Sequence, residues 1–250
     1  MTRRQLMRHT AWFGAAVVLT VTGGEVSSQI ARADEQPAAL AKDPNALRFL
    51  QISDSHLGFK GTANTAVEQS FADAIQQINE YRKAFGQGTV GDGWYSFDLR
   101  GVHFISLVNT LSLESLGHLG QDQIEFVRQD VAKLSSDTPI VVFSHIPLFA
   151  LYPKWGWGTD DATQALSYLK RFSSVTCLNG HIHQLFTKTE GNITFHSATT
   201  TAYPLPRPGE RPAPSPVTLP AGKLKAALGI REVQYVEGTE RLAIKDVELA

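Results

Sequence analysis

Three short histidine-containing segments each follow directly on an apolar run, and this repeated arrangement constrains the fold more than any other feature of the sequence. The segments are residues 54–56 (Asp-Ser-His), 144–145 (Ser-His) and 180–183 (Gly-His-Ile-His). The apolar run before each has the length and composition of a buried strand. Because ligands of open α/β sheets bind at the carboxyl ends of the strands, we expect the three segments to meet at one edge of a sheet.

The residue types in these segments are those of a transition-metal site. Asp-x-His and His-x-His place two side chains on the same side of an extended segment. A carboxylate together with several imidazoles suits Fe, Mn or Zn better than Ca or Mg. A lone histidine after a strand is ordinarily structural, but the three strand ends taken together predict divalent metal ions. The predicted metal ligands are Asp54, His56, His145, His181 and His183.

The motifs resemble those of the calcineurin-like metallophosphoesterases. The similarity extends from about residue 47 to 195 and is carried by residues 52–58, 143–148 and 179–184. Within that superfamily the sequence is most similar to bacterial exported phosphoesterases akin to cyclic-nucleotide phosphodiesterases and purple acid phosphatases. The resemblance implies an α/β fold, a layered α/β/β/α sandwich. It also implies two metal ions, one held by Asp54, His56 and His183 and the other by His145 and His181.

The sequence departs from the family between the first and second histidine segments. The family carries a Gly-Asp motif and a Gly-Asn-His (or Gly-Glu-His) motif there, each after its own strand, and the first supplies the aspartate that bridges both ions. No Gly-Asn-His or Gly-Glu-His occurs in this chain, and Gly91-Asp92 lies in a glycine loop. We interpret Asp92 as a loop residue, with a substitute bridging role as the alternative. The sandwich is therefore expected to lack a central strand-helix-strand block, lost between about Glu80 and Tyr81.

The missing motifs bear on how many ions are held and on activity. Without a bridging carboxylate, two neighbouring cations repel each other with little compensation. The sequence therefore leaves the number of bound ions open at two, one or none. We expect a metal-dependent hydrolase acting on a small-molecule or nucleotide phosphomonoester or phosphodiester through a metal-activated hydroxide, with impaired activity. The alternative is a non-catalytic remnant that binds metal or a partner. No catalytic residue is identified beyond the metal ligands.

Several other residues admit a functional or a structural interpretation. Trp155 and Trp157 follow the second histidine segment in an aromatic loop, where they line a substrate pocket or pack the loop onto the domain. His103, His118 and His196 are further histidines; His103 and His196 lie in predicted strands, where a structural role is expected.

The N-terminal residues predict export. Arg3-Arg4 opens a segment that resembles a twin-arginine signal, an apolar run covers residues 11–21, and Ala31-Arg32-Ala33 forms a small-x-small cleavage pattern before Asp34. The run is shorter than the roughly 20 residues of a spanning helix, so no stable membrane span is expected after cleavage. We predict a signal peptide at 1–33, the twin-arginine export machinery as a partner, and a periplasmic or secreted bacterial protein. An uncleaved anchor is the alternative.

The remaining residues predict one globular domain. A flexible lead-in is expected at 34–46 and the metallophosphoesterase-like domain at 47–250, with seven prolines making 203–220 an extended surface loop. The formal net charge of −1 provides no basic surface for nucleic acid. Cys177 is the only cysteine, and its apolar neighbours predict a core position. Strands are predicted at 47–52, 94–99, 102–108, 139–143, 174–178, 193–195, 233–235 and 242–247, and helices around 67–78, 124–134 and 162–172. Asp160 or Asp161 is the expected N-cap of the last helix.

Overall fold

The computed structural model describes residues 16–22, 25–31, 46–79, 93–110, 115–236 and 242–249, with residues 16–22, 25–31 and 75–79 described by their backbone alone. The strands are β1 (Ala16–Thr22), β2 (Glu25–Ala31), β3 (Leu47–Gln51), β4 (Tyr95–Leu99), β5 (Val102–Ser106), β6 (Ile140–Phe143), β7 (Val175–Asn179), β8 (Phe186–Glu190), β9 (Ile193–Ser197), β10 (Gly229–Tyr235) and β11 (Ala243–Glu248). The helices are α2 (Val67–Asn79), α3 (Gln121–Asp130) and α4 (Ala162–Leu169), with 3-10 turns η3 (Val131–Lys133), η4 (Pro153–Trp155) and η5 (Lys225–Ala227).

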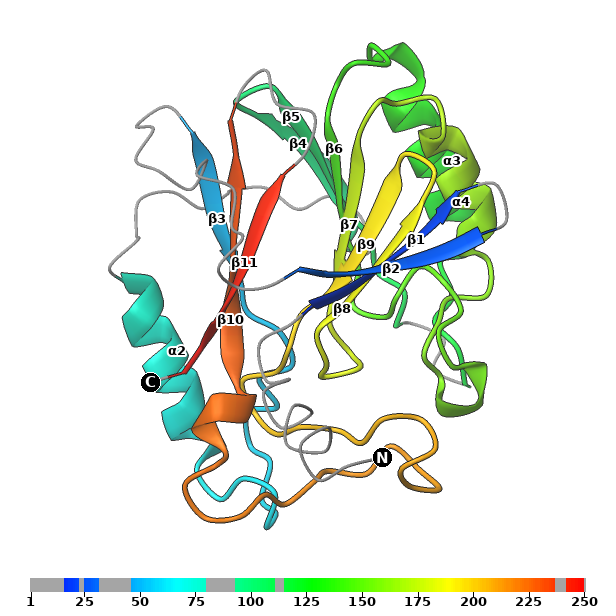
Figure 1. Cartoon of the computed structure of the whole chain (residues 1–250). Coiled ribbons are helices and arrows are strands. Elements are labelled where there is room, and N and C mark those ends of the chain that lie inside the picture. The colour runs from blue at the N-terminus through cyan, green and yellow to red at the C-terminus, as the bar shows by residue number, and fades with distance from the viewer. Residues whose placement is uncertain are drawn as a thin grey trace.

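These elements form four layers. One sheet has the strand order β2-β1-β8-β9-β7-β6-β5-β4, and a second has the order β11-β10-β3. The two sheets face each other, with α3 and α4 outside the larger sheet and α2 outside the smaller one (Figure 1). This is the α/β/β/α arrangement that the sequence predicted.

Apolar side chains between the layers hold the sheets together. Phe49 of β3 packs edge-on against Phe104 of β5 and Phe143 of β6, with ring centroids 5.7 and 5.8 Å apart. A separate core lies between the larger sheet and helices α3 and α4, and Cys177 is buried in it as expected. Ala74 of α2 packs on the outer face of the smaller sheet. Every layer therefore buries an apolar face, the condition for a stable layered domain.

The strand directions bring the predicted site segments together. Strands β5, β6, β7 and β9 are parallel neighbours, so their carboxyl ends share one edge of the larger sheet. The loops after β6 and β7 carry the second and third histidine segments. The first segment follows β3 of the smaller sheet, whose only strand partner among the described residues is β10. The predicted loss of a block near residues 80 and 81, and Asp92 itself, lie outside the described residues.

Two differences from the predicted elements have simple physical causes. Strand β8 was not predicted, because its sequence Phe-Thr-Lys-Thr-Glu has no apolar run; it is held instead by antiparallel pairing with β9. Asp161 was predicted, with Asp160, as a cap of α4. It occupies that position without a capping hydrogen bond, and its carboxylate accepts the amides of Leu119 and Gly120 at 2.9 and 2.8 Å, just before α3.

The N-terminal strands lie inside the segment predicted to be a signal peptide. Strand β1 pairs in parallel with β8, and β2 pairs antiparallel with β1. Removal of residues 1–33 would take both strands away and leave β8 at the edge of the sheet. Cleavage and export stay predictions. Within the described part of the chain, no helix has both the length and the apolar character to cross a membrane.

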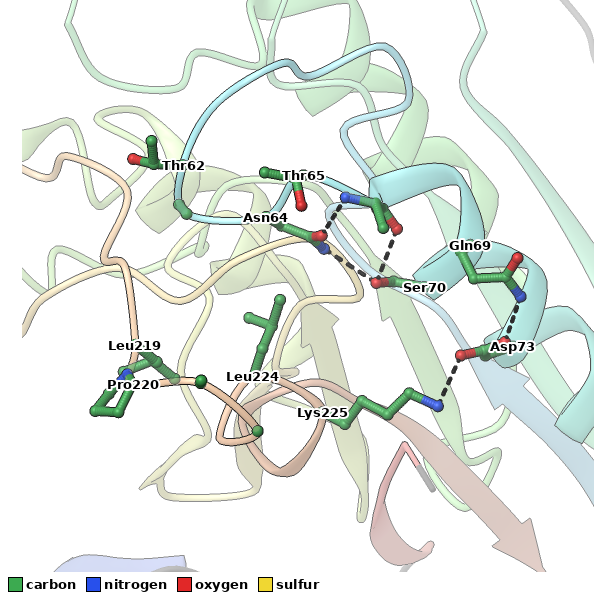
Figure 2. Close-up of a pocket in the computed structure, with 14 residues that line it drawn as sticks. Thr62, Asn64, Thr65, Gln69, Ser70, Asp73, Leu219, Pro220, Leu224 and Lys225 are labelled. Carbon is green, nitrogen blue, oxygen red and sulfur yellow. Dashed lines mark hydrogen bonds and ion pairs between the residues drawn. The ribbon is translucent and has the colours of Figure 1, made fainter.

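The proline-rich segment 203–220 contains no helix or strand, as predicted, and part of it faces the start of α2 across a cavity of about 330 Å³ (Figure 2). Lys225 beyond it pairs with Asp73 of α2 at 3.1 Å. Asn64 accepts the amide of Ala66 at 2.8 Å and donates to the carbonyl of Ala202 at 2.6 Å. Asn64 thereby ties the start of α2 to the chain entering the proline-rich segment.

Candidate metal centre

Three of the five predicted ligands converge into one group. One carboxylate oxygen of Asp54 and one ring nitrogen each of His56 and His183 all lie within 4.8 Å of one another. His183 Nε2 is 3.1 Å from His56 Nε2 and 3.4 Å from Asp54 Oδ1. His56 and His183, 127 positions apart in the chain, therefore meet between the two sheets, because β3 and β7 belong to different sheets; the expectation of one edge of a single sheet was wrong.

The backbone at these positions is left-handed. Asp54, His56, His181 and His183 have φ values of 51°, 44°, 68° and 55°. Among the described residues, the only other non-glycine residue with positive φ is Arg100, in the tight turn between β4 and β5. Such a conformation costs on the order of 1–2 kcal/mol for a residue with a Cβ. Strain of this kind clusters at functional sites, where the surrounding structure maintains it.

The carboxylate of Asp54 is buried and held by several donors. Its side chain is 1% exposed, and the amide of His181 donates to both oxygens, at 3.1 and 2.9 Å. The hydroxyl of Ser53 also donates to it. Burial alone would raise the pKa of the Asp54 carboxyl, but the hydrogen bond and charge that His183 contributes in its protonated form, with the charge of protonated His145 and the Ser53 hydroxyl, hold that pKa well below its usual range. The group is therefore ionised at neutral pH, as a metal ligand must be.

Gly180 is needed for close approach. A Cβ at this position would collide with the Ser53 hydroxyl and an Asp54 carboxylate oxygen. Gly180 is not among the residues with positive φ, so the sharp turn of the motif is made by His181 and His183 themselves. The glycine lets the third histidine segment close directly onto Asp54.

The imidazole of His183 presents a lone pair to the site. Its Nδ1 lies 2.6 Å from the carbonyl oxygen of Tyr203, which can only accept, so Nδ1 carries the proton. Nε2 is then unprotonated and faces Asp54 and His56. Burial and the charge of His183 lower the pKa of His56, although Asp54 opposes this. One carboxylate and two neutral imidazoles at this separation fit a divalent transition metal ion.

The other two predicted ligands lie beside this group. His145 Nε2 is 3.8 Å from Asp54 Oδ1, and its side chain is 46% exposed. The rings of His145 and His181 meet edge-on at 5.1 Å. Burial, followed by the charge of His145, lowers the pKa of His181 to about 4, and the carbonyl of Gly156 hydrogen-bonds its ring. In the described part of the chain, His145 and His181 do not complete a second group of three ligand atoms around Asp54.

A cavity of about 300 Å³ adjoins the site. It is lined by the ends of β3, β5, β6 and β7 and by their following residues, Asp54 and His145 among them. His145 is the exposed imidazole at the wall of this cavity.

His103 and His196 have structural partners. His103 lies between Asp98 and Asp130, at 2.8 Å from each. His196 is half-buried beside Thr187 in the β8–β9 hairpin. The structural role expected for both agrees with these contacts.

His118 belongs to a second group of possible ligands, with Asp160 and Asp161. It pairs with Asp160 at 2.8 Å on the surface. Both carboxylate oxygens of Asp161 accept amides at the start of α3, so the group ties two loops together.

The two tryptophans differ in their surroundings. Trp157 is 1% exposed and its ring meets Trp155 edge-on at 5.1 Å. Of the two interpretations left open by the sequence, burial favours packing of the loop for Trp157. Trp155 is half-buried, and contact between it and a substrate stays a prediction.

Two residues that support the site were not predicted. Asn109, fully buried, donates to the carbonyl of Ile146 at 2.8 Å and accepts the amide of Ile146 at 3.1 Å, which fixes the turn after His145. Its signal was available, since it is a polar residue shortly after the apolar strand β5. Tyr203 contacts both His56 and His183, and no motif marks it.

The fold and the site define a two-sheet α/β protein with a candidate metal centre at its strand ends. No protein-family profile matches the sequence, and no curated protein matches it. The structure is similar in part to a dimetal phosphatase from Danio rerio, with 17% identity and a TM-score of 0.32, over 54% of this chain and 40% of that protein. It is also similar in part to a candidate 5'-nucleotidase from Staphylococcus aureus, with 12% identity and a TM-score of 0.34, over 64% of this chain and 29% of that protein. The chain spans less than half the length of either protein.

Proposed function

We propose that this protein is a metal-dependent phosphoesterase that hydrolyses a phosphomonoester or phosphodiester. The observation that carries the proposal is the convergence of Asp54, His56 and His183, with an ionised carboxylate and the Nε2 of His183 free of a proton. These three residues would hold a divalent ion, which would lower the pKa of water at the site and neutralise charge on the phosphoryl oxygens.

The chain's own groups prepare the site in three ways. The amide of His181 and the hydroxyl of Ser53 donate to the Asp54 carboxylate and fix its orientation. The Tyr203 carbonyl holds the proton of His183 on Nδ1. His145, half-exposed at the wall of the neighbouring cavity, is placed to hydrogen-bond a phosphate oxygen of a bound ester. A small-molecule or nucleotide ester is the class of substrate that the cavity suits.

The second candidate function is a non-catalytic protein that binds a metal ion or a partner. It is favoured by one observation, that His145 and His181 do not complete a second three-ligand group in the part of the chain that the structure describes. The absence of Gly-Asn-His and Gly-Glu-His from the sequence supports the same alternative. One bound ion without turnover is its expected behaviour.

Metal content and hydrolysis measured together test both candidates. The full-length protein is loaded separately with Mn²⁺, Fe²⁺ and Zn²⁺, its metal content is measured, and p-nitrophenyl phosphate and bis(p-nitrophenyl) phosphate serve as substrates. We expect chelation to abolish turnover and His183→Ala to weaken metal binding by at least about 100-fold, since even loss of a group behind a ligand costs 10–100-fold. His196→Gln, outside both groups of possible ligands, is the matched control. Turnover that survives chelation contradicts the phosphoesterase proposal, and metal binding without turnover supports the non-catalytic alternative.

Export is a separate proposal that rests on the N-terminal sequence. The paired arginines, the short apolar run and the Ala-Arg-Ala pattern support a twin-arginine signal cleaved near Asp34. N-terminal sequencing of the protein from the periplasm tests it, and a periplasmic form that begins at Met1 contradicts cleavage.

A further inference from the structure

Tyr203 contacts both histidines of the candidate metal centre, through different atoms. Its carbonyl oxygen is 2.6 Å from His183 Nδ1, and its hydroxyl is 3.1 Å from His56 Nδ1. Its ring also packs against both imidazoles, with centroids 4.8 Å from His56 and 5.1 Å from His183. One residue therefore touches the rear of both rings, on the side away from their Nε2 atoms.

The two Nε2 atoms lie 3.1 Å apart. With the proton of His183 on Nδ1, its Nε2 carries a lone pair. If His56 likewise donates from Nδ1 to the Tyr203 hydroxyl, its Nε2 also carries a lone pair. The two lone pairs then face each other across the 3.1 Å between the Nε2 atoms. Two such lone pairs repel each other, and a cation between them and the Asp54 carboxylate removes the repulsion. Metal-binding histidines usually have this second contact, from the far ring nitrogen to an oxygen.

We propose that Tyr203 is the positioning residue of the metal centre, whose carbonyl and hydroxyl together turn the Nε2 lone pairs of His183 and His56 toward one divalent ion. This inference rests on the metal site of the proposed function and adds the residue that organises it. Tyr203 does not contact the ion or the substrate in this role. It acts by fixing the ring orientation and the position of the proton in both imidazoles.

The backbone around Tyr203 is fixed well enough to serve as a support. Asn64 donates to the carbonyl of Ala202 at 2.6 Å. The hydroxyl of Thr200 accepts the amide of Ala202 and donates to the backbone carbonyl of Asp54, each at 2.9 Å. Pro204 follows at once and restricts Tyr203 to extended backbone conformations. The support for the two imidazoles is thus hydrogen-bonded to the loop that carries the carboxylate ligand.

Tyr203→Phe tests the hydroxyl separately from the carbonyl. The variant keeps the ring and the backbone, so it removes the contact with His56 Nδ1 and retains the contact with His183. Co²⁺ is the probe, because its visible absorption reports the geometry of its ligands. We expect the variant to bind Co²⁺ about 10–100-fold more weakly than the wild type, with an altered absorption spectrum. Tyr235→Phe makes the same chemical change at a tyrosine buried between the sheets and is the matched control.

A second measurement needs no variant. The ¹⁵N chemical shifts of the wild-type imidazoles, recorded for the Zn²⁺-loaded protein, distinguish the ring nitrogen that carries the proton from the one that binds the ion. We expect Nδ1 to carry the proton in both His183 and His56. Failure of the wild type to bind Co²⁺ overturns the metal site and this inference together. If the wild type binds Co²⁺ and Tyr203→Phe binds it equally well with the same spectrum, or if His56 carries its proton on Nε2, the inference alone is overturned.

Discussion

The backbone amide of His181 donates to both carboxylate oxygens of Asp54, at 3.1 and 2.9 Å, and so joins two motifs that lie 127 residues apart. The Asp54 loop follows the smaller sheet and the His181 loop follows the larger one. This contact therefore couples the two sheets at the candidate metal centre.

Metal ions are expected to stabilise the fold. An ion that binds only the folded state at 100 times its Kd adds about 2.7 kcal/mol. For a chain of this length that corresponds to a rise in Tm of about 5–10 °C. Thermal unfolding with and without Mn²⁺ measures the rise, and excess chelator should reverse it. Asp54→Asn should show no rise, and an equal rise in that variant contradicts the proposed ligand set.

Substitution of Gly180 should damage the centre more than the rest of the fold. A Cβ in Gly180→Ala would overlap the Ser53 hydroxyl and the Asp54 carboxylate, so the loop must move away from its ligand. We expect weaker Co²⁺ binding together with a lower Tm. In Gly101→Ala the new Cβ meets no atom within 4 Å, and only the positive φ of 77° adds strain, of about 1 kcal/mol. Gly101→Ala should lose stability and keep its metal affinity. Equal losses of metal affinity in Gly180→Ala and Gly101→Ala would show that the close contact of Gly180 with Asp54 is not what maintains the centre.

The two tryptophans should respond differently to truncation. Trp157 is 1% exposed, so Trp157→Ala should lower the free energy of unfolding by about 3–5 kcal/mol. Trp155 is half-buried, and Trp155→Ala should cost less. Denaturant unfolding of both variants measures the difference. A larger loss for Trp155→Ala would show that it is the principal packing residue of this loop.

Asn109 should matter for the position of His145 as well as for stability. Asn109→Ala leaves the buried amide of Ile146 without its partner, at a cost of about 1–3 kcal/mol, and leaves the Ile146 carbonyl with the Ser144 hydroxyl as its donor. Asn192 is a matched control, since its side chain donates to two backbone carbonyls, those of Leu169 and Phe172, away from the site. We expect both variants to lose stability and only Asn109→Ala to lose phosphate-ester turnover beyond that loss. Equal turnover in the two variants argues against a positioning role.

His103 should make stability depend on pH. Burial by itself lowers the pKa of His103, but hydrogen bonds and charges from Asp130 and Asp98 outweigh it and raise the pKa. A raised pKa in the folded state stabilises the fold below the unfolded value of about 6.5, and this contribution is lost as pH rises through the folded pKa. The difference in the free energy of unfolding between the wild type and His103→Gln should therefore be larger at pH 6 than at pH 9, by about 1 kcal/mol in favour of the wild type. Denaturant unfolding at both pH values measures this, and an unchanged difference rejects the mechanism.

The strand ends were predictable because their signals are local. Residues 139–143 and 174–178 are apolar runs followed by histidines, and parallel strands of this kind are buried on both faces. The layered α/β/β/α arrangement was implied by the family resemblance that the same motifs carry. Strand β8 was not predictable, because its polar sequence gains its structure from β9.

The support of the site was less accessible to sequence reasoning. Tyr203 lies in a proline-rich stretch with no periodic pattern, and its contacts are with residues 20 and 147 positions away. Asn109 carried a weak local signal as a polar residue after a strand. The sequence also could not show why a glycine is required at position 180, because the residues that leave no room for a Cβ there, Ser53 and Asp54, lie on another loop.

The left-handed backbone at four motif residues lowers the stability of the fold, while their side chains are the proposed ligands: Asp54, His56, His181 and His183. Glycine or asparagine adopts that conformation at lower cost, so replacement of His56 by asparagine should relieve strain while it removes a ligand. Random mutagenesis followed by selection for heat resistance alone should accordingly enrich such replacements at these positions. Selection that also requires metal binding should exclude them, and the contrast between the two outcomes would map the centre without any substrate in hand.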